Sequence, residues 1–184
     1  GKSTKAAIHR RGVAALGVLT LIPPFVLAQV PSVVVSPGSN LNAYVAPNGV
    51  TVVNINQSNA AGLSHNQYQN FNVNANGLIL NNTTSAQIAY QSQWAGQVTA
   101  NFNQVNTARV ILNEVVSNNR SQLAGFTEVL GGRADVVLAN PYGITCSGCG
   151  FINTDRVTLS TGNPFLASNG GLGGFSVCQG DILI

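Results

Sequence analysis

Asparagine and glutamine supply most of the polar side chains of this chain, and charged side chains are scarce. The 184 residues include 23 Asn and 11 Gln, every Asn lies at position 40 or later, and charged residues make up only 7%. Soluble domains usually carry about 25% charged residues. Because Asn and the 20 Gly favour tight turns and disfavour helix interiors, the composition excludes a charged helical bundle and a coiled coil. It favours many short strands joined by tight turns.

The positive charge of the chain is confined to its first residues. The formal net charge is +3, but four of the eight basic residues lie within the first eleven positions. From residue 29 onward the chain has four Arg and five acidic residues, so the formal net charge of this part is 4 − 5 = −1. Nucleic-acid binding needs clustered Lys and Arg, and the sequence therefore predicts no nucleic-acid partner.

The first 28 residues have the order of a secretory signal peptide. A basic stretch up to residue 12 precedes the apolar run Val13–Ile22, and Val26 and Ala28 are suited to the −3 and −1 positions of a cleavage site before Gln29. A membrane anchor is the alternative, but it needs an apolar run of roughly 18 residues or more. We therefore expect residues 1–28 to be part of a signal read by the Sec machinery, with cleavage between Ala28 and Gln29 and the true start further upstream.

Short apolar segments recur along the remaining chain and predict strands. They are separated by turn residues, as at Asn76-Gly77, and only the segment Ala86–Ala95 shows a weak helical pattern. Val136 and Val157 are 21 residues apart, and Val157 and Val177 are 20 apart. A repeat near twenty residues favours a β-solenoid, in which stacked Asn side chains form ladders. A β-sandwich remains the alternative on the pattern alone.

Long stretches of the sequence resemble a known family. Residues 48–82 and 109–162 are similar, in the family order, to the two-partner secretion domain at the N-terminus of filamentous haemagglutinins and contact-dependent growth-inhibition exoproteins. The runs that carry the resemblance are Asn48–Ile55, Gly62–Tyr68 with Phe71–Val73, Gly77–Asn82, Ile111–Val115, Asn119–Gly125 and, most strongly, Arg133–Ile144 continued by Cys146–Thr154.

The resemblance implies an all-β fold and a role in secretion. We expect residues 29–184 to form a right-handed parallel β-helix with an N-terminal cap and small extra antiparallel sheets, as the N-terminal part of a much longer exoprotein. Such domains are not enzymes and carry no cofactor or small-molecule substrate. They pass through the periplasm of a Gram-negative bacterium, are recognised by a TpsB-type outer-membrane β-barrel transporter with periplasmic domains, and nucleate folding at or beyond the cell surface.

The resemblance also indicates candidate recognition residues. The family motif Asn-Pro-Asn-Gly-Ile is present as Asn140-Pro141-Tyr142-Gly143-Ile144, with Tyr142 in place of the second Asn. The family's other short motif, Asn-Pro-Asn-Leu, is absent as such, and Asn113 lies in the corresponding region. By its chemistry, Asn140–Gly143 is also a β-turn, because Asn starts turns, Pro fixes φ and Gly supplies a positive φ. A purely structural turn and a direct transporter contact both remain open.

Cys146 and Cys149 form a Cys-x-x-Cys pair around Ser147 and Gly148. A zinc site needs about four ligands, and with no second pair the sequence predicts no metal site. In an exported chain a disulfide across a turn is expected, with buried reduced thiols as the alternative. Cys178 is left over.

The other side chains that stand out have structural roles in our interpretation. We expect Arg120 to bind backbone carbonyls or Glu114, and Arg133 to pair with Asp135 at the edge of a coil. His65 is expected to be a capping residue rather than a catalyst, and Trp94 to lie in the core or a cap.

Two other functions are compatible with a solenoid. Solenoid enzymes that cleave polysaccharides need carboxylates, often paired, and the mature region has five acidic residues with no Asp-Asp or Asp-x-Asp pair. An adhesin module that binds glycans or receptors through amides and Trp94 is the main alternative to a secretion domain.

Overall fold

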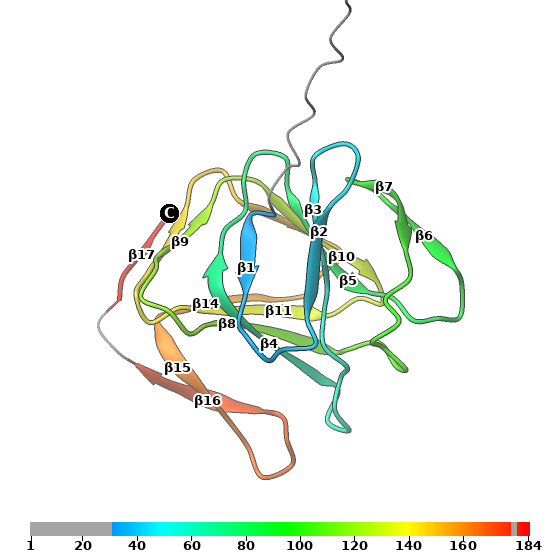
Figure 1. Cartoon of the computed structure of the whole chain (residues 1–184). Helices are drawn as coiled ribbons and strands as arrows, with labels where there is room; N and C mark the ends of the chain where they lie inside the picture. The colour runs from blue at the N-terminus through cyan, green and yellow to red at the C-terminus, as the bar shows by residue number, and fades with distance from the viewer. Residues whose placement is uncertain (1–30, 178–179) are drawn as a thin grey trace, which may run out of the picture.

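The computed structural model describes residues 31–177 and 180–184. These residues form seventeen strands and no helix (Figure 1). The predicted signal segment 1–28, its cleavage site at Ala28 and Gln29, and Cys178 lie outside the described residues.

Most strands belong to three sheets that enclose one core. The first sheet has the order β1 (Val33–Val35), β4 (Leu63–Phe71), β8 (Val110–Val115), β11 (Asp135–Ala139) and β14 (Val157–Ser160). The second has the order β13 (Gly150–Ile152), β10 (Phe126–Gly131), β5 (Leu78–Asn82), β3 (Thr51–Asn54) and β2 (Asn42–Val45). The third consists of β17 (Ile182–Leu183), β12 (Ile144–Cys146) and β9 (Ser121–Leu123).

Successive passes of the chain visit these sheets in turn and pair in parallel, which makes the fold a β-helix. In the first sheet Ile111 pairs with Val136 and Val136 pairs with Val157, one coil later each time. In the second sheet, β3, β5, β10 and β13 stack in parallel in the same way. The predicted β-helix is therefore confirmed over the β-sandwich, and so is the repeat from Val136 to Val157.

Two antiparallel strands cap the N-terminal end. Strand β1 pairs antiparallel with β4, and β2 pairs antiparallel with β3. Both lie at the outer edge of their sheets, where they cover the first parallel strands (Figure 1).

Two hairpins project from the coils and were harder to predict. The hairpin β6 (Ala89–Ser92) and β7 (Gly96–Thr99) interrupts the coil between β5 and β8. The expected weak helix over 86–95 is therefore wrong. The hairpin β15 (Gly162–Leu166) and β16 (Leu172–Val177) lies between β14 and β17. Val177 pairs with Gly162 in this hairpin, so the predicted second repeat from Val157 to Val177 is also wrong.

Apolar side chains from all three sheets fill the space inside the coils. The main cluster includes Val53, Tyr68, Leu80, Ile111 and Ile144, all of which are buried. Smaller apolar clusters lie outside the coils, where hairpins cover the sheets: Ala95 and Val98 pack on the second sheet, and Leu172 and Phe175 pack on the first. The hairpins thus stabilise the fold by burying apolar side chains on the outer faces of the sheets that would otherwise contact water.

Candidate functional site

The predicted recognition motif forms the corner that joins β11 to β12. The Gly143 amide donates to the carbonyl of Asn140 at 3.0 Å, which closes a four-residue turn. The Tyr142 amide donates to the Asn140 side-chain oxygen, also at 3.0 Å. Gly143 has a φ of 106°, a conformation that side chains with a Cβ rarely adopt. The turn predicted from the Asn-Pro-x-Gly chemistry is confirmed.

The side chain of Asn140 points inward and connects this corner to the previous coil. It is fully buried, and its amide nitrogen donates to the carbonyl of Asn119 and to the hydroxyl of Ser121, both at 2.9 Å. In return, the Ser121 amide donates to the carbonyl of Gly143. In the folded domain Asn140 therefore has a structural role.

Asn113 lies on β8, on the coil before the Asn140 corner, and is also fully buried. Its amide nitrogen donates to the carbonyl of Val137 at 3.2 Å, and its oxygen accepts from the Tyr68 hydroxyl at 3.1 Å. Burial raises the pKa of that hydroxyl. The structure brings the two predicted Asn residues onto neighbouring coils, but neither side chain contacts solvent.

Tyr142 is the exposed member of the motif. Its side chain is 53% exposed, and with Pro141 it borders an open pocket of about 320 Å³. The other walls come from the end of β8 and from β15. The complete lining is Glu114, Val115, Val116, Ser117, Pro141, Tyr142 and Asn163. Sequence reasoning missed this pocket, because its walls come from three distant segments.

Arg120 holds the last coil against this corner. Its guanidinium donates to the hydroxyl of Thr145, to the carbonyl of Ile144 and to the carboxylate of Asp181, the last at 2.5 Å. This interaction lowers the pKa of Asp181. The predicted binding of Arg120 to backbone carbonyls is confirmed. The alternative prediction, that Arg120 pairs with Glu114, is wrong, because Glu114 lies on the outer side of the first sheet and bonds to His65 and Gln67.

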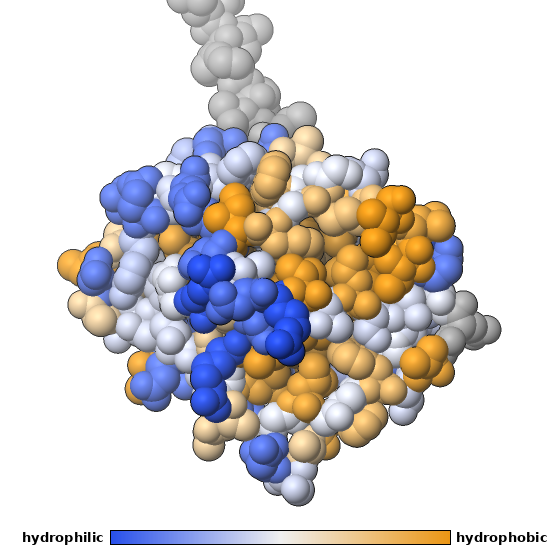
Figure 2. Space-filling view, turned by 180° about the vertical axis from the view of Figure 1, so that it is seen from behind, coloured by the Kyte–Doolittle hydropathy of each residue, from blue (hydrophilic) through white to orange (hydrophobic). Residues whose placement is uncertain are grey.

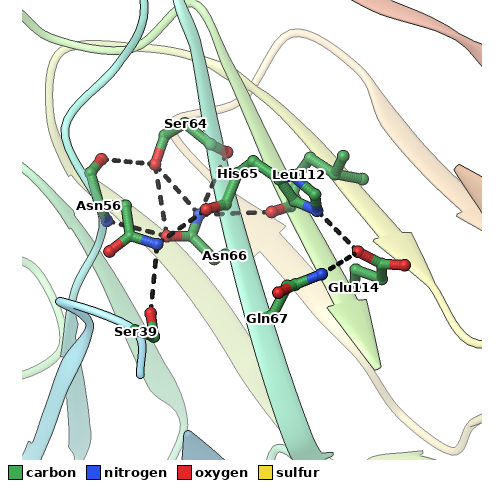
Figure 3. A network of polar contacts seen from close by, with 8 residues as sticks. All are labelled: Ser39, Asn56, Ser64, His65, Asn66, Gln67, Leu112 and Glu114. Carbon is green, nitrogen blue, oxygen red and sulfur yellow. Dashed lines mark hydrogen bonds and ion pairs between the residues drawn. The ribbon is translucent and has the colours of Figure 1, made fainter. Parts of the chain in front are cut away.

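A polar network with Glu114 at one end follows β4 and β8 (Figure 3). His65 Nε2 lies 2.7 Å from Glu114 Oε2, and the amide of Gln67 donates to the same oxygen at 2.9 Å. These bonds, with that of His65 foremost, lower the pKa of Glu114 against the opposing effect of burial. His65 thus lies in a strand next to a carboxylate and is not the capping residue that the sequence predicted.

The opposite end of this network links β4 to the segment after β3. The buried Asn66 accepts from the backbone amide of Asn56 at 2.8 Å and donates to the carbonyl of Leu112 at 3.3 Å. The side-chain amide of Asn56 in turn donates to the carbonyl of His65 at 2.8 Å. Amide side chains here bond mainly to backbone groups. Asn81 and Asn54 form a direct amide pair at 2.8 Å on stacked strands, as expected of an Asn ladder.

A disulfide joins Cys146 and Cys149, with the Cα atoms 5.3 Å apart. It spans the corner between β12 and β13, where Gly148 has a φ of 76°. This short separation is what a turn provides and an extended segment does not.

Other predicted contacts were wrong or incomplete. Arg133 pairs with Asp155 at 2.5 Å rather than with Asp135, because the next coil brings Asp155 beside it. Trp94 lies outside the coils on the hairpin turn, with its ring against Phe126 and its indole N–H donating to the carbonyl of Asn76.

The described residues contain no cluster of three or more His, Cys, Asp or Glu side chains that could hold a metal ion. Within the same ranges, no helix of the length and apolarity needed to cross a membrane was found.

Comparisons with known proteins agree with the fold. The model of the TPS secretion domain family matches residues 33–184. The chain is 54% identical over 140 residues to "tRNA nuclease CdiA" of Yersinia mollaretii, covering 76% of this chain and 5% of that protein. It is 51% identical over 137 residues to "Hemolysin" of Proteus mirabilis, covering 74% of this chain and 8% of that protein.

A solved structure of the filamentous hemagglutinin secretion domain is similar with a TM-score of 0.74 and 37% identity, covering 82% of this chain and 48% of that one. The chain spans less than a tenth of the length of the two curated relatives above. The family model accounts for nearly all of the described residues, and the chain belongs to the TPS secretion domain family.

Proposed function

We propose that this chain is the domain that targets a large exoprotein to its cognate TpsB-type outer-membrane β-barrel transporter and nucleates β-helix folding outside the cell. The observation that carries the proposal is the family match over residues 33–184. The domain would reach the periplasm through the Sec machinery of a Gram-negative bacterium and act without catalysis of its own. The nuclease names of some relatives belong to proteins of which this chain covers about a twentieth.

The last coil offers a template for further coils. Strands β13, β14 and β17 are each the final strand of their sheet, so each has one edge with no paired strand among the described residues. Exposed large apolar residues of this coil are Val157, Ile182, Leu183 and Ile184. Figure 2 shows hydrophobic areas on both sides of a hydrophilic band on the face opposite to that of Figure 1. Open parallel edges pair readily with another strand, and a solenoid grows by packing each coil on its neighbour.

The burial of Asn113 and Asn140 constrains how a transporter would recognise them. Both side chains are inaccessible in the folded domain, so a partner that reads them must do so while the chain is unfolded or partly folded. An extended segment can add to a sheet edge of the partner, where backbone hydrogen bonds supply affinity and alternate side chains supply specificity. We place the contact at Asn113 and the segment Asn140–Ile144.

Two matched variants separate recognition from folding. Asn140→Ala changes the motif and removes the bonds to Asn119, to Ser121 and from the Tyr142 amide. Ser121→Ala removes one of these bonds and leaves the motif intact. We expect Asn140→Ala to reduce the secreted yield well below that of Ser121→Ala at comparable melting temperatures. Equal secretion of the two variants would contradict a role of Asn140 in recognition.

A further inference from the structure

The pocket beside the Asn140–Gly143 corner has an unusual combination of walls. Its floor is the end of β8, and its rim is formed by Pro141 and Tyr142 on one side and by Asn163 of β15 on the other. These three wall segments belong to three different passes of the chain around the β-helix. The pocket therefore exists only in the folded domain.

Glu114 is the one charged residue of this pocket lining. Both hydrogen bonds of Glu114, from His65 and Gln67, go to Oε2. Figure 3 shows the other carboxylate oxygen directed away from these two residues. The side chain of Glu114 is only 16% exposed, and its lowered pKa keeps it ionised at neutral pH. The described residues provide no hydrogen-bond partner for the second oxygen of this carboxylate. A negative charge that is partly removed from water in this way favours a cationic hydrogen-bond donor.

The other walls are apolar or already engaged. Val116 and Tyr142 are 44% and 53% exposed, and Pro141 borders the pocket beside Tyr142. The hydroxyl of Ser117 donates to the carbonyl of Gln69 and accepts from a backbone amide. A saccharide needs several hydrogen-bonding groups around its ring, whereas these walls offer, besides the carboxylate of Glu114 and the amide of Asn163, mainly the side chains of Val116, Pro141 and Tyr142.

We propose that this pocket binds an arginine side chain presented by a protein partner of the folded domain. The alkyl stem would contact Val116 and Pro141, and the guanidinium would lie near the Tyr142 ring and donate to Glu114 Oε1. Arginine suits the pocket better than lysine, because its planar guanidinium stacks on aromatic rings and is more weakly hydrated than an ammonium. The inference is independent of transporter recognition before folding, since it requires the folded corner.

The test uses N-acetyl-arginine amide and its neutral isostere N-acetyl-citrulline amide as probes. Backbone NMR shifts of the purified, folded domain are followed as each probe is added. We expect shifts confined to residues 114–117 and 141–143, with a Kd on the order of millimolar for the arginine compound, and at least about fivefold weaker binding of the citrulline compound.

Variants show whether the named groups are responsible. Glu114→Gln and Tyr142→Ala should each weaken arginine binding by at least about threefold. Asp155→Asn, which removes a carboxylate outside the pocket lining, should leave it unchanged. The spectrum of each variant without probe confirms that it is folded.

Three results would overturn the proposal: no shifts with the arginine probe, equal binding of both probes, or equal binding by the Tyr142→Ala variant. A methyl galactoside that shifts the same residues when arginine does not would instead assign the pocket to a sugar.

Discussion

At the scale of single residues, buried amides join one coil to the next. Asn113, Asn140 and Asn66 are all fully buried, and each donates to a backbone carbonyl on a neighbouring coil. A buried amide without a partner would destabilise the fold, so each of these side chains must lie at one particular position in the stack. This explains how a chain with so few charges is rich in Asn without being disordered.

The contribution of one such amide can be measured. Asn113→Ala leaves the buried Tyr68 hydroxyl and the Val137 carbonyl without this partner, and we expect it to lower the free energy of unfolding by about 1–3 kcal/mol. Asn118→Ala, at an exposed position in the connection that follows β8, should change it by less than about 0.5 kcal/mol. Urea unfolding checks both, and equal effects would contradict the role assigned to Asn113.

Glu114 should make stability depend on pH on the acid side. Its pKa in the folded domain is lowered from the ordinary 4.5, mainly by the bond from His65. Its contribution is therefore complete above the unfolded pKa and is lost as the pH falls through the folded pKa. We expect urea midpoints between pH 6 and pH 3 to fall less in Glu114→Gln than in the unmodified protein. Parallel pH profiles for the two proteins would refute this assignment.

At the scale of elements, a buried carboxylate anchors the β6–β7 hairpin to the coils. Glu128 of β10 accepts from the Ser92 hydroxyl at 2.6 Å and from the backbone amides of Gln93 and Trp94 at 3.0 and 3.2 Å. Packing of Val98 on the second sheet adds to this attachment. The hairpin is thus held by a few identifiable contacts rather than by the parallel ladders.

Removing that anchor should release the hairpin without unfolding the coils. In Glu128→Ala we expect faster amide hydrogen exchange across Ala89–Thr99, because three donors lose their bond to the carboxylate, and unchanged exchange in β11. Hydrogen exchange read by NMR distinguishes the two regions. A uniform increase over the whole domain would show that Glu128 supports the core instead.

The corner between β12 and β13 carries a covalent link that depends on the compartment. We expect the Cys146–Cys149 bond in exported protein, and its loss through Cys149→Ala should lower stability by about 2 kcal/mol or less, because the closed loop is short. Peptide mass mapping of secreted protein tests the bond, and two free thiols after export would contradict it.

At the scale of the whole molecule, sequence patterns predicted the buried parallel strands best. The apolar run Ala134–Ala139 corresponds to β11, and the Asn140–Gly143 turn forms as its chemistry indicates. Strand β4 gave a weaker signal, because Asn66 points into the core while Gln67 is exposed, so that polar residues occupy both faces. Partners contributed by a later coil, such as Asp155 for Arg133, depend on the stacking register and could not be read from local spacing.

The two hairpins and the pocket were beyond prediction for a related reason. The β6–β7 hairpin interrupts the repeat between β5 and β8, and its sequence has no apolar alternation strong enough to indicate strands. The pocket needs Glu114, Tyr142 and Asn163 to be brought together by three passes of the chain. The sequence offered one signal for such a site, which is the presence of single carboxylates such as Glu114. In a chain with few charges, a charged residue indicates a specific partner.

The central claim is that this domain directs secretion through a dedicated transporter. The most direct measurement is the amount of the chain that reaches the medium from a Gram-negative host with and without the cognate outer-membrane transporter. We expect secretion only when the transporter is present, with the chain retained in the periplasm otherwise. Equal amounts in the medium under both conditions would contradict the claim.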